Sequence, residues 1–285
     1  MTPARKTTVQ LPDGTTLPRL GLGTWRMGES AATRKDEIRA VRHAIQSGCS
    51  LIDTAEMYGD GGAEDVVGAA VRTSGIARDQ FFVVSKVYPW NASRLGTIAA
   101  CQQSLKRLGL ASLDLYLLHW RGEHPLAETV EAFEQLKSDG KIRRWGVSNF
   151  DTDDMRELAG VAAPGACAVN QVYYNLAKRW PEASLLPWQR QHGIACMAYS
   201  PLNQGALAKH GVVKAVAARR GATPVQVALA WLLSFPDVVA IPKSARISGI
   251  DEIADTERLL LTAEDFAELQ RAFPSPPAAA KMETT

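Results

Sequence analysis

The chain has 285 residues, 46% of them hydrophobic, which is enough for a sizeable core. Its 32 basic and 30 acidic residues leave a net charge of +2, so it lacks the strongly basic surface of nucleic-acid-binding proteins, and we expect no nucleic-acid partner. No run of about 18 apolar residues indicates a membrane span, and no apolar segment after residues 1–6 indicates a secretory signal. The four cysteines are scattered without the close pairing of a disulfide framework or a zinc site. We therefore expect a soluble, cytoplasmic protein with no metal centre.

A hairpin and then a regular alternation of strands and helices are predicted along the chain. Residues 7–11 and 16–17 flank Pro12-Asp13-Gly14, whose turn chemistry indicates a β-hairpin. After it, short apolar segments alternate with stretches in which apolar residues recur at helical spacing. The predicted strand and helix pairs are 20–23 with 36–46, 51–53 with 64–72, 81–86 with 98–108, 113–119 with 130–137, 142–147 with 155–158, 168–172 with 183–191, 194–199 with 225–233, and 238–241 with 250–257.

Eight strand–helix units joined by short connections predict the α/β class and a closed (β/α)8 barrel, the TIM barrel. The N-terminal β-hairpin cannot join a parallel barrel, so we expect it to cap the far end. An extra C-terminal helix, 263–272, has a good N-cap in Thr262. The tail beyond Phe273 is rich in proline and alanine, and we expect its very end to be mobile. No linker divides the chain, so residues 1–285 are predicted to form a single domain.

Three predicted strands end in a side chain that can carry or move a proton. These residues are Asp53, Lys86 and His119, and Tyr58 follows Asp53 in a loop. In a parallel barrel the carboxyl ends of the strands carry the chemistry. A phenol with a pKa of about 10 is a poor acid at neutral pH, but a nearby ammonium lowers that pKa and a carboxylate keeps the ammonium charged. A neutral imidazole can donate to a carbonyl oxygen. Together the four groups predict a device that protonates a carbonyl group while hydride is added to it.

Each of these residues also has a purely structural explanation when it is taken alone. Asp53 is typical of a helix N-cap or a turn, and Tyr58 of a surface aromatic residue. Lys86 is typical of a solvated strand end, and His119 of a hydrogen-bonded core histidine. Their joint occurrence at three strand ends favours catalysis.

The motifs at the strand ends resemble those of the aldo-keto reductase superfamily over nearly the whole chain. The matching segments are Gly21-x-Gly23-Thr24-Trp25, Asp53-Thr54-Ala55-x-x-Tyr58, Ser85-Lys86, Leu115-x-x-x-His119-Trp120, Gly146-Val147-Ser148-Asn149, Asn170-Gln171, Tyr199-Ser200-Pro201-Leu202 and Ile241-Pro242-Lys243-Ser244. A narrower set, residues 27–29, 54–58 and 86–91, is similar to bacterial members linked to the reduction of methylglyoxal and other small aldehydes.

The resemblance implies a role for each matching residue. Tyr58 would be the general acid, Lys86 and Asp53 would tune it, and His119 would orient the substrate oxygen. Three residues would hold the nicotinamide carboxamide and a tyrosine would stack on its ring: Ser148, Asn149, Gln171 and Tyr199. The full set implied to bind the cofactor is Gly23, Thr24, Trp25, Asp53, Ser148, Asn149, Gln171, Tyr199, Ser200, Leu202, Lys243, Ser244 and Arg246.

We do not expect a nucleotide site of the Rossmann type. No G-x-G-x-x-G motif opens a helix after a strand. Lys243, Ser244 and Arg246 instead follow the eighth strand, where barrels commonly bind phosphate, and they predict a site for the 2′-phosphate of NADPH. Gly249 and Ile253 stand where many relatives have a charged residue and an asparagine. We therefore expect a smaller preference for NADPH over NADH than in those relatives.

Four aromatic residues just beyond strand ends predict the substrate pocket: Trp25, Tyr88, Trp90 and Trp120. Each alone fits a surface aromatic, but together they indicate an apolar pocket with few polar anchors. Such walls suit methylglyoxal, other 2-oxoaldehydes and aromatic aldehydes better than sugars. The loop at 202–211 is short, so we expect no slow closure over the cofactor.

Two other functions remain open from the residues alone. One is an aldolase that uses Lys86 as a Schiff-base nucleophile, and the other is a non-catalytic nucleotide-sensing subunit. A metal-dependent hydrolase is disfavoured because no H-x-H ends the first strand. The sequence thus predicts a monomeric NADPH-dependent reductase that turns small aldehydes and ketones into alcohols.

Overall fold

The structure, a computed structural model, describes residues 7–284. The predictions that touch residues 1–6 and 285 therefore lie partly outside it. An antiparallel hairpin comes first, formed by β1 (Thr8–Gln10) and β2 (Thr16–Pro18). One parallel sheet follows, with its eight strands in chain order. They are β3 (Leu22–Gly23), β4 (Leu51–Asp53), β5 (Phe82–Val87), β6 (Leu115–Leu118), β7 (Trp145–Ser148), β8 (Cys167–Tyr173), β9 (Ala195–Tyr199) and β10 (Val238–Ala240).

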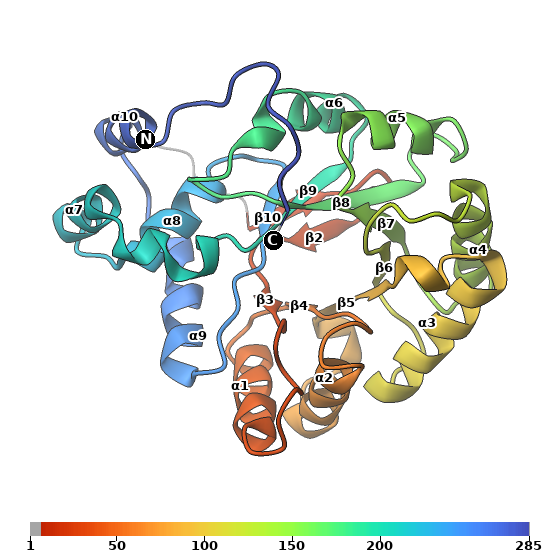
Figure 1. Cartoon of the computed structure of the whole chain (residues 1–285). Helices are drawn as coiled ribbons and strands as arrows, with labels where there is room; N and C mark the ends of the chain where they lie inside the picture. The colour runs from red at the N-terminus through yellow and green to blue at the C-terminus, as the bar shows by residue number, and fades with distance from the viewer. Residues whose placement is uncertain (1–6, 285) are drawn as a thin grey trace.

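The sheet closes into a barrel through the segments at its two edges. The backbone N–H of Gly21 donates to the carbonyl of Ala240 at 2.9 Å, and that of Gly23 donates to the carbonyl of Pro242 at 2.8 Å. Gly23 also forms a parallel bridge with Lys243. Figure 1 looks along this barrel, with the helices as an outer ring around the strands. The predicted (β/α)8 barrel is confirmed.

Every predicted helix is present. The helices that follow the strands are α1 (Arg34–Gln46), α2 (Gly62–Ser74), α3 (Arg94–Leu108), α4 (Leu126–Ser138), α5 (Thr152–Ala159), α6 (Leu185–Gln191), α8 (Pro224–Leu232) and α9 (Ile247–Ala254). Two further helices are α7 (Gly211–Arg220) and α10 (Ala263–Ala272). Several begin before the first apolar residue because their caps lie upstream, as at Ser93, whose side chain accepts the N–H of Gly96. Thr262 caps α10 as predicted. Within the described residues no helix is long and apolar enough to cross a membrane.

Side chains on a strand alternate between two faces, so each barrel strand has one row that faces the interior. In β4, β5 and β6 this row runs from apolar to polar: Leu51 then Asp53, Val84 then Lys86, and Leu117 then His119 just after the strand. The apolar members pack with three hairpin residues: Val9, Leu11 and Leu17. The hairpin therefore plugs one end of the interior, and the polar side chains collect at the other.

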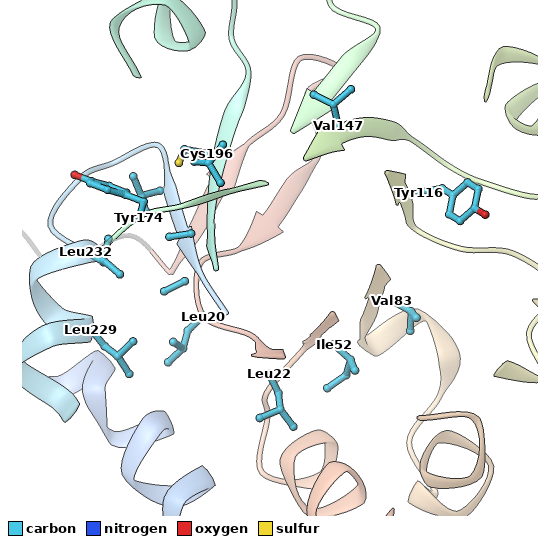
Figure 2. Packing of buried hydrophobic residues seen from close by; sticks show 14 of the residues in the cluster. Leu20, Leu22, Ile52, Val83, Tyr116, Val147, Tyr174, Cys196, Leu229 and Leu232 are labelled. Carbon is cyan, nitrogen blue, oxygen red and sulfur yellow. The ribbon is translucent and has the colours of Figure 1, made fainter. Parts of the chain in front are cut away.

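The opposite row on each strand packs outward against the helices. Figure 2 shows Leu22, Ile52, Val83 and Tyr116 pointing from their strands toward the surrounding ring. This outer layer is the larger of the two apolar clusters and includes buried residues of the helices, such as Leu229. Because both faces of the sheet are apolar over most of their length, the polar strand ends stand on a rigid frame.

Candidate active site

Lys86 is the centre of a buried hydrogen-bond network at the carboxyl ends of β4 and β5. Its ammonium donates to both carboxylate oxygens of Asp53, at 2.9 and 2.8 Å, and to the carbonyl oxygen of Thr54 at 3.0 Å. It also donates to the phenol oxygen of Tyr58 at 3.3 Å. The side chains of Lys86 and Asp53 are only 0% and 2% exposed. Three of the predicted catalytic residues are thus in direct contact.

The electrostatics of this network keep both of its proton carriers protonated. Burial alone would lower the pKa of Lys86, but the Asp53 carboxylate and the Tyr58 phenol hold it above its usual value. Burial raises the pKa of Tyr58, the Lys86 ammonium lowers it, and Asp53 raises it, with a net upward shift. The predicted lowering by the ammonium is present, but burial outweighs it. Tyr58 is therefore a phenol with its proton at neutral pH.

His119 completes the predicted group of four. Its ring centroid lies 5.8 Å from that of Tyr58, in an edge-to-face arrangement. Burial, with the nearby Lys86 ammonium, holds the pKa of His119 well below its usual value, so the imidazole is neutral. Nδ1 is buried without a hydrogen-bond partner among the described residues. Nε2 is therefore the nitrogen that can reach a ligand in the cavity.

The loop that carries Tyr58 is held by close packing between glycines. A Cβ on Gly62 would lie 2.5 Å from the carbonyl oxygen of Gly28, and one on Gly59 would lie 2.9 Å from that of Met27. Gly28 itself has a φ of 75°, which L side chains rarely adopt. Its N–H donates to the carboxylate of Glu37 at 2.8 Å. The loops after β3 and β4 are thus locked together, which fixes the position of the phenol.

A cavity of about 560 Å³ opens at the carboxyl ends of the strands. The predicted site residues that line it are Gly23, Trp25, Asp53, Tyr58, His119, Trp120, Ser148, Asn149, Gln171, Tyr199, Ser200 and Lys243. Lys86 is not part of the lining and reaches the cavity only through Tyr58 and Asp53. The structure therefore brings together residues from seven segments of the chain around one cavity.

One wall of this cavity offers amide and hydroxyl groups beside an aromatic face. The Asn149 amide donates to the carbonyl oxygen of His119 at 3.1 Å and to the hydroxyl of Ser148 at 3.2 Å, and it accepts from the Tyr199 phenol at 2.9 Å. The Tyr199 ring stacks on Tyr173 with centroids 5.5 Å apart. Asn149 has a φ of 55°, a strained conformation of the kind that collects at functional sites. A flat ring that carries an amide fits this wall.

Two of the four aromatic residues predicted for the substrate pocket lie in the cavity wall. Trp25 and Trp120 line the cavity, whereas Tyr88 and Trp90 do not. Tyr88 stacks on Trp90 with centroids 5.7 Å apart, both contact Trp120, and Trp90 is 70% exposed. In the turn after β5, the Glu56 carboxylate accepts the N–H of Tyr88 at 2.6 Å. Burial raises the pKa of Glu56.

Four of the predicted cofactor residues also lie outside the cavity lining: Thr24, Leu202, Ser244 and Arg246. The Thr24 hydroxyl donates a hydrogen bond to the carbonyl oxygen of Asp53 at 3.0 Å, so it supports the end of β4 rather than facing the cavity. Ser244 and Arg246 belong to the loop before α9, and a Cβ on Gly249 in that helix would lie 2.4 Å from the Ser244 hydroxyl. Lys243 and Arg246 are exposed, and neither forms an ion pair within residues 7–284. They remain available to an anion.

Seven residues of the cavity wall were not among the predicted site residues: Met57, Arg121, Asp154, Pro201, Ile241, Met282 and Thr284. The last two belong to the tail, which crosses the helix ring toward the centre of the barrel in Figure 1. An ion pair between Glu283 and Lys178 ties it there. No local signal marks these two tail residues. Arg121 follows Trp120 directly and could have been found from its position beyond a strand end.

The arrangement can protonate an oxygen atom held in the cavity. Tyr58 is the proton carrier that faces the cavity, and neutral His119 can donate a hydrogen bond to the same oxygen. An aldolase role for Lys86 does not fit, because a Schiff-base lysine must lose its proton, and the Asp53 carboxylate holds the proton on Lys86.

Comparisons with known proteins agree with this geometry. The profile of the Aldo/keto reductase family matches residues 19–273. Methylglyoxal reductase YeaE of Escherichia coli (strain K12) is 48% identical over 273 residues, which cover 94% of this chain and 95% of that protein. Glyoxal reductase of Bacillus subtilis (strain 168) is 37% identical over 264 residues, with 93% and 92% covered. A solved aldo/keto reductase from Klebsiella pneumoniae, in complex with NADP and acetate, is 48% identical with a TM-score of 0.93, and covers 98% of this chain and 100% of its own. This chain belongs to the aldo/keto reductase family.

Proposed function

We propose that this chain uses NADPH to reduce small aldehydes and ketones to alcohols, with methylglyoxal, other 2-oxoaldehydes and aromatic aldehydes as its substrates. The observation that carries the proposal is the Tyr58 phenol, which is tied to the Lys86–Asp53 pair and opens on the same cavity as the Asn149 and Gln171 amides. The relatives point the same way, since one is named a methylglyoxal reductase and another a glyoxal reductase.

The side chains divide the work of carbonyl reduction. NADPH supplies the hydride that reduces the carbonyl carbon. His119 orients the substrate oxygen with its Nε2–H, and Tyr58 gives its proton to that oxygen, so that the product is an alcohol and the phenolate later regains a proton from water. Lys86 stabilises the transient phenolate, and Asp53 holds Lys86 charged and in place.

The cavity wall fits the nicotinamide half of the cofactor. Ser148, Asn149 and Gln171 provide hydrogen-bonding groups for the carboxamide, and the stacked Tyr199 ring provides a face for the nicotinamide. Lys243 and Arg246, exposed and without ion-pair partners in residues 7–284, are placed to receive a 2′-phosphate. These two cations favour NADPH over NADH. The margin is modest, because Gly249 and Ile253 stand where many relatives have a charged residue and an asparagine.

The substrate end of the cavity is walled by apolar side chains. Trp25, Trp120, Met57 and Met282 contribute to the lining, with Arg121 as a charged member already paired to Glu157. A polyhydroxylated sugar would leave hydroxyl groups without partners against such walls, which costs free energy for each group. Small 2-oxoaldehydes and flat aromatic aldehydes match better.

We also propose that residues 1–285 act as one domain and as a cytoplasmic monomer. The closure of the barrel by the 19–23 and 240–243 segments supports a single folding unit, because neither half can complete the barrel alone. Size-exclusion chromatography with light scattering tests the monomer, for which the mass should be near the 30.9 kDa of one chain. A stable mass of twice that value would contradict it.

Turnover of methylglyoxal with NADPH and with NADH tests the proposed function. We expect many turnovers per enzyme, with a higher kcat/KM for NADPH, and a higher kcat/KM for methylglyoxal and benzaldehyde than for xylose or glucose. Binding of NADPH without turnover of any aldehyde would identify a sensor. The highest kcat/KM for a sugar would overturn the substrate class, and trapping of substrate on Lys86 by borohydride would revive the aldolase.

A further inference from the structure

Gln171 makes a contact that its expected role as a cofactor ligand does not require. Its side chain amide nitrogen donates to Oδ1 of Asp53 at 2.8 Å, and it also lies 3.0 Å from the sulfur of Met197. Gln171 is on β8 and Asp53 is on β4, which are the sixth and second strands of the eight. The two residues therefore meet across the interior of the barrel, 118 positions apart in the chain.

The chemistry of Asp53 determines which way the Gln171 amide points. A carboxylate that already accepts from an ammonium has only acceptor oxygens, so the amide nitrogen must face it. The amide oxygen of Gln171 is then left to accept from a donor in the cavity that Gln171 lines. The Gln171 amide thus connects the Lys86–Asp53 pair, which supports Tyr58, to the cavity wall that carries Ser148 and Asn149. This wall is the proposed nicotinamide site and is called the cofactor wall or nicotinamide wall below.

We propose that Gln171 is a positioning residue for the proton donor: its N–H holds the Asp53 carboxylate against Lys86, and so couples the nicotinamide wall to the acidity of Tyr58. The roles of Tyr58, Lys86 and Asp53 are those of the proposed function, on which this inference rests. Oδ1 of Asp53 accepts from both Gln171 and Lys86, while Oδ2 accepts from Lys86 and from no other donor within residues 7–284. The amide therefore limits rotation of the carboxylate out of its two-point contact.

The N–H dipole also offsets part of the negative charge of Asp53. That charge acts against ionisation of Tyr58, because two negative groups would then lie close together. The charged or titratable groups that face Tyr58 are Asp53 from β4, Lys86 from β5 and His119 after β6. Of these, His119 is neutral, so a change at Gln171 reaches Tyr58 through Asp53 and Lys86.

The first test measures the ionisation of Tyr58 in cofactor-free protein by NMR of ¹³Cζ-labelled tyrosine, with the resonance assigned by its loss in Tyr58→Phe. Gln171→Met keeps the length of the side chain and removes the donor, so it should raise the pKa of Tyr58 by about half a unit or more. Ser148→Ala is the matched control, because it alters the same cofactor wall without contacting Asp53. Both variants should weaken NADPH binding, measured by fluorescence titration, but only Gln171→Met should shift Tyr58.

A Tyr58 titration in Gln171→Met that coincides with the wild type would overturn the proposal and leave Gln171 as a cofactor ligand only. The same shift in Ser148→Ala would also overturn it, because the effect would then belong to the wall in general. Neither measurement depends on turnover, so failure here is distinct from failure of the proposed function.

The second test uses Gln171→Glu, which places two carboxyl groups in contact. Such a pair shares a proton that leaves at a raised pKa. While the proton is present the hydrogen bond to Asp53 is kept, and when it leaves the two charges repel. At saturating NADPH, the kcat profile of Gln171→Glu should therefore gain an ionisation between about pH 5 and 9 that the wild type lacks. A folded variant, judged by circular dichroism, whose profile has the wild-type shape would contradict the inference.

Discussion

The buried group around Lys86 and the segment 243–246 before α9 carry charges in opposite kinds of environment. Lys86 and Asp53 are almost fully buried and make direct contacts with each other. Lys243 and Arg246 are exposed and have no ion-pair partner within residues 7–284. Charges interact strongly where water is excluded and weakly where it screens them. The comparison teaches that the buried charges are held in a fixed geometry by their own contacts, whereas the two exposed cations have no charged partner within residues 7–284 to hold them.

Loss of the phenol should have the largest effect. Tyr58→Phe keeps the ring and removes the proton, so kcat should fall by about 10²- to 10⁴-fold, the usual contribution of a general acid. NADPH binding, followed by fluorescence titration, should be retained. A variant that keeps more than about a tenth of wild-type kcat would assign the acid to another group.

Loss of the buried ammonium should damage both activity and stability. Lys86→Met leaves the Asp53 carboxylate buried without its cation, which typically costs about 3–5 kcal/mol of the free energy of unfolding. Urea unfolding should show this loss, and kcat should fall nearly as far as in Tyr58→Phe. The double variant Asp53→Asn/Lys86→Met removes the unpaired charge, so it should recover much of the stability but none of the activity. Additive losses in the double variant would show that the pair is not a unit.

Removal of an exposed cation should act on one cofactor only. Arg246→Ala should raise KM for NADPH roughly 10- to 100-fold, since each 1.4 kcal/mol is tenfold in affinity, and should leave NADH kinetics and stability nearly unchanged. Lys214→Ala, which removes an exposed charge on α7, is the control for net charge. An equal loss with both cofactors would place Arg246 away from the 2′-phosphate.

A single methyl group at the start of α2, just after the loop that carries Tyr58, sharpens the comparison further. In Gly62→Ala the new Cβ meets the carbonyl oxygen of Gly28 at 2.5 Å, so the two loops must separate. We expect a loss of about 1–3 kcal/mol in the free energy of unfolding, the usual cost of overpacking, and a fall in kcat with little change in KM for NADPH. Gly211→Ala is the control, because its Cβ would meet nothing within 4 Å. Unchanged kcat in Gly62→Ala would mean that the loop adjusts without moving the phenol.

The smallest effect is expected from pH in the neutral range. The acid form of Tyr58 exists below its pKa, and burial raises that pKa, so the proton is lost only as the pH rises above the usual tyrosine value of about 10. The lowered pKa of His119 keeps the imidazole neutral throughout. The kcat profile should therefore be flat from about pH 6.5 to 9 and fall only in more alkaline solution. An inflection near pH 6.5 would show that His119 titrates during catalysis.

Several features of the fold and the site follow from local pattern alone. Apolar segments that end in Asp53, Lys86 and His119 indicate parallel strands with polar carboxyl ends, because the period of two places every second side chain on one face. The turn at residues 12–14 and the N-cap at Thr262 are equally local, since each rests on a hydrogen bond between near neighbours. The barrel, the hairpin and the four catalytic candidates could therefore be read from the sequence.

What the sequence could not decide are distances between segments that are remote in the chain. Trp25 and Trp120 line the cavity, whereas Tyr88 and Trp90 lie outside its lining and pack against Trp120. The tail is held at the cavity by the ion pair between Glu283 and Lys178, which no local sequence pattern predicts. The Gln171 amide meets Asp53 only because a closed barrel brings its second and sixth strands face to face. Such contacts depend on how the closed barrel positions its strands and loops, and this is a property of the tertiary structure rather than of any segment.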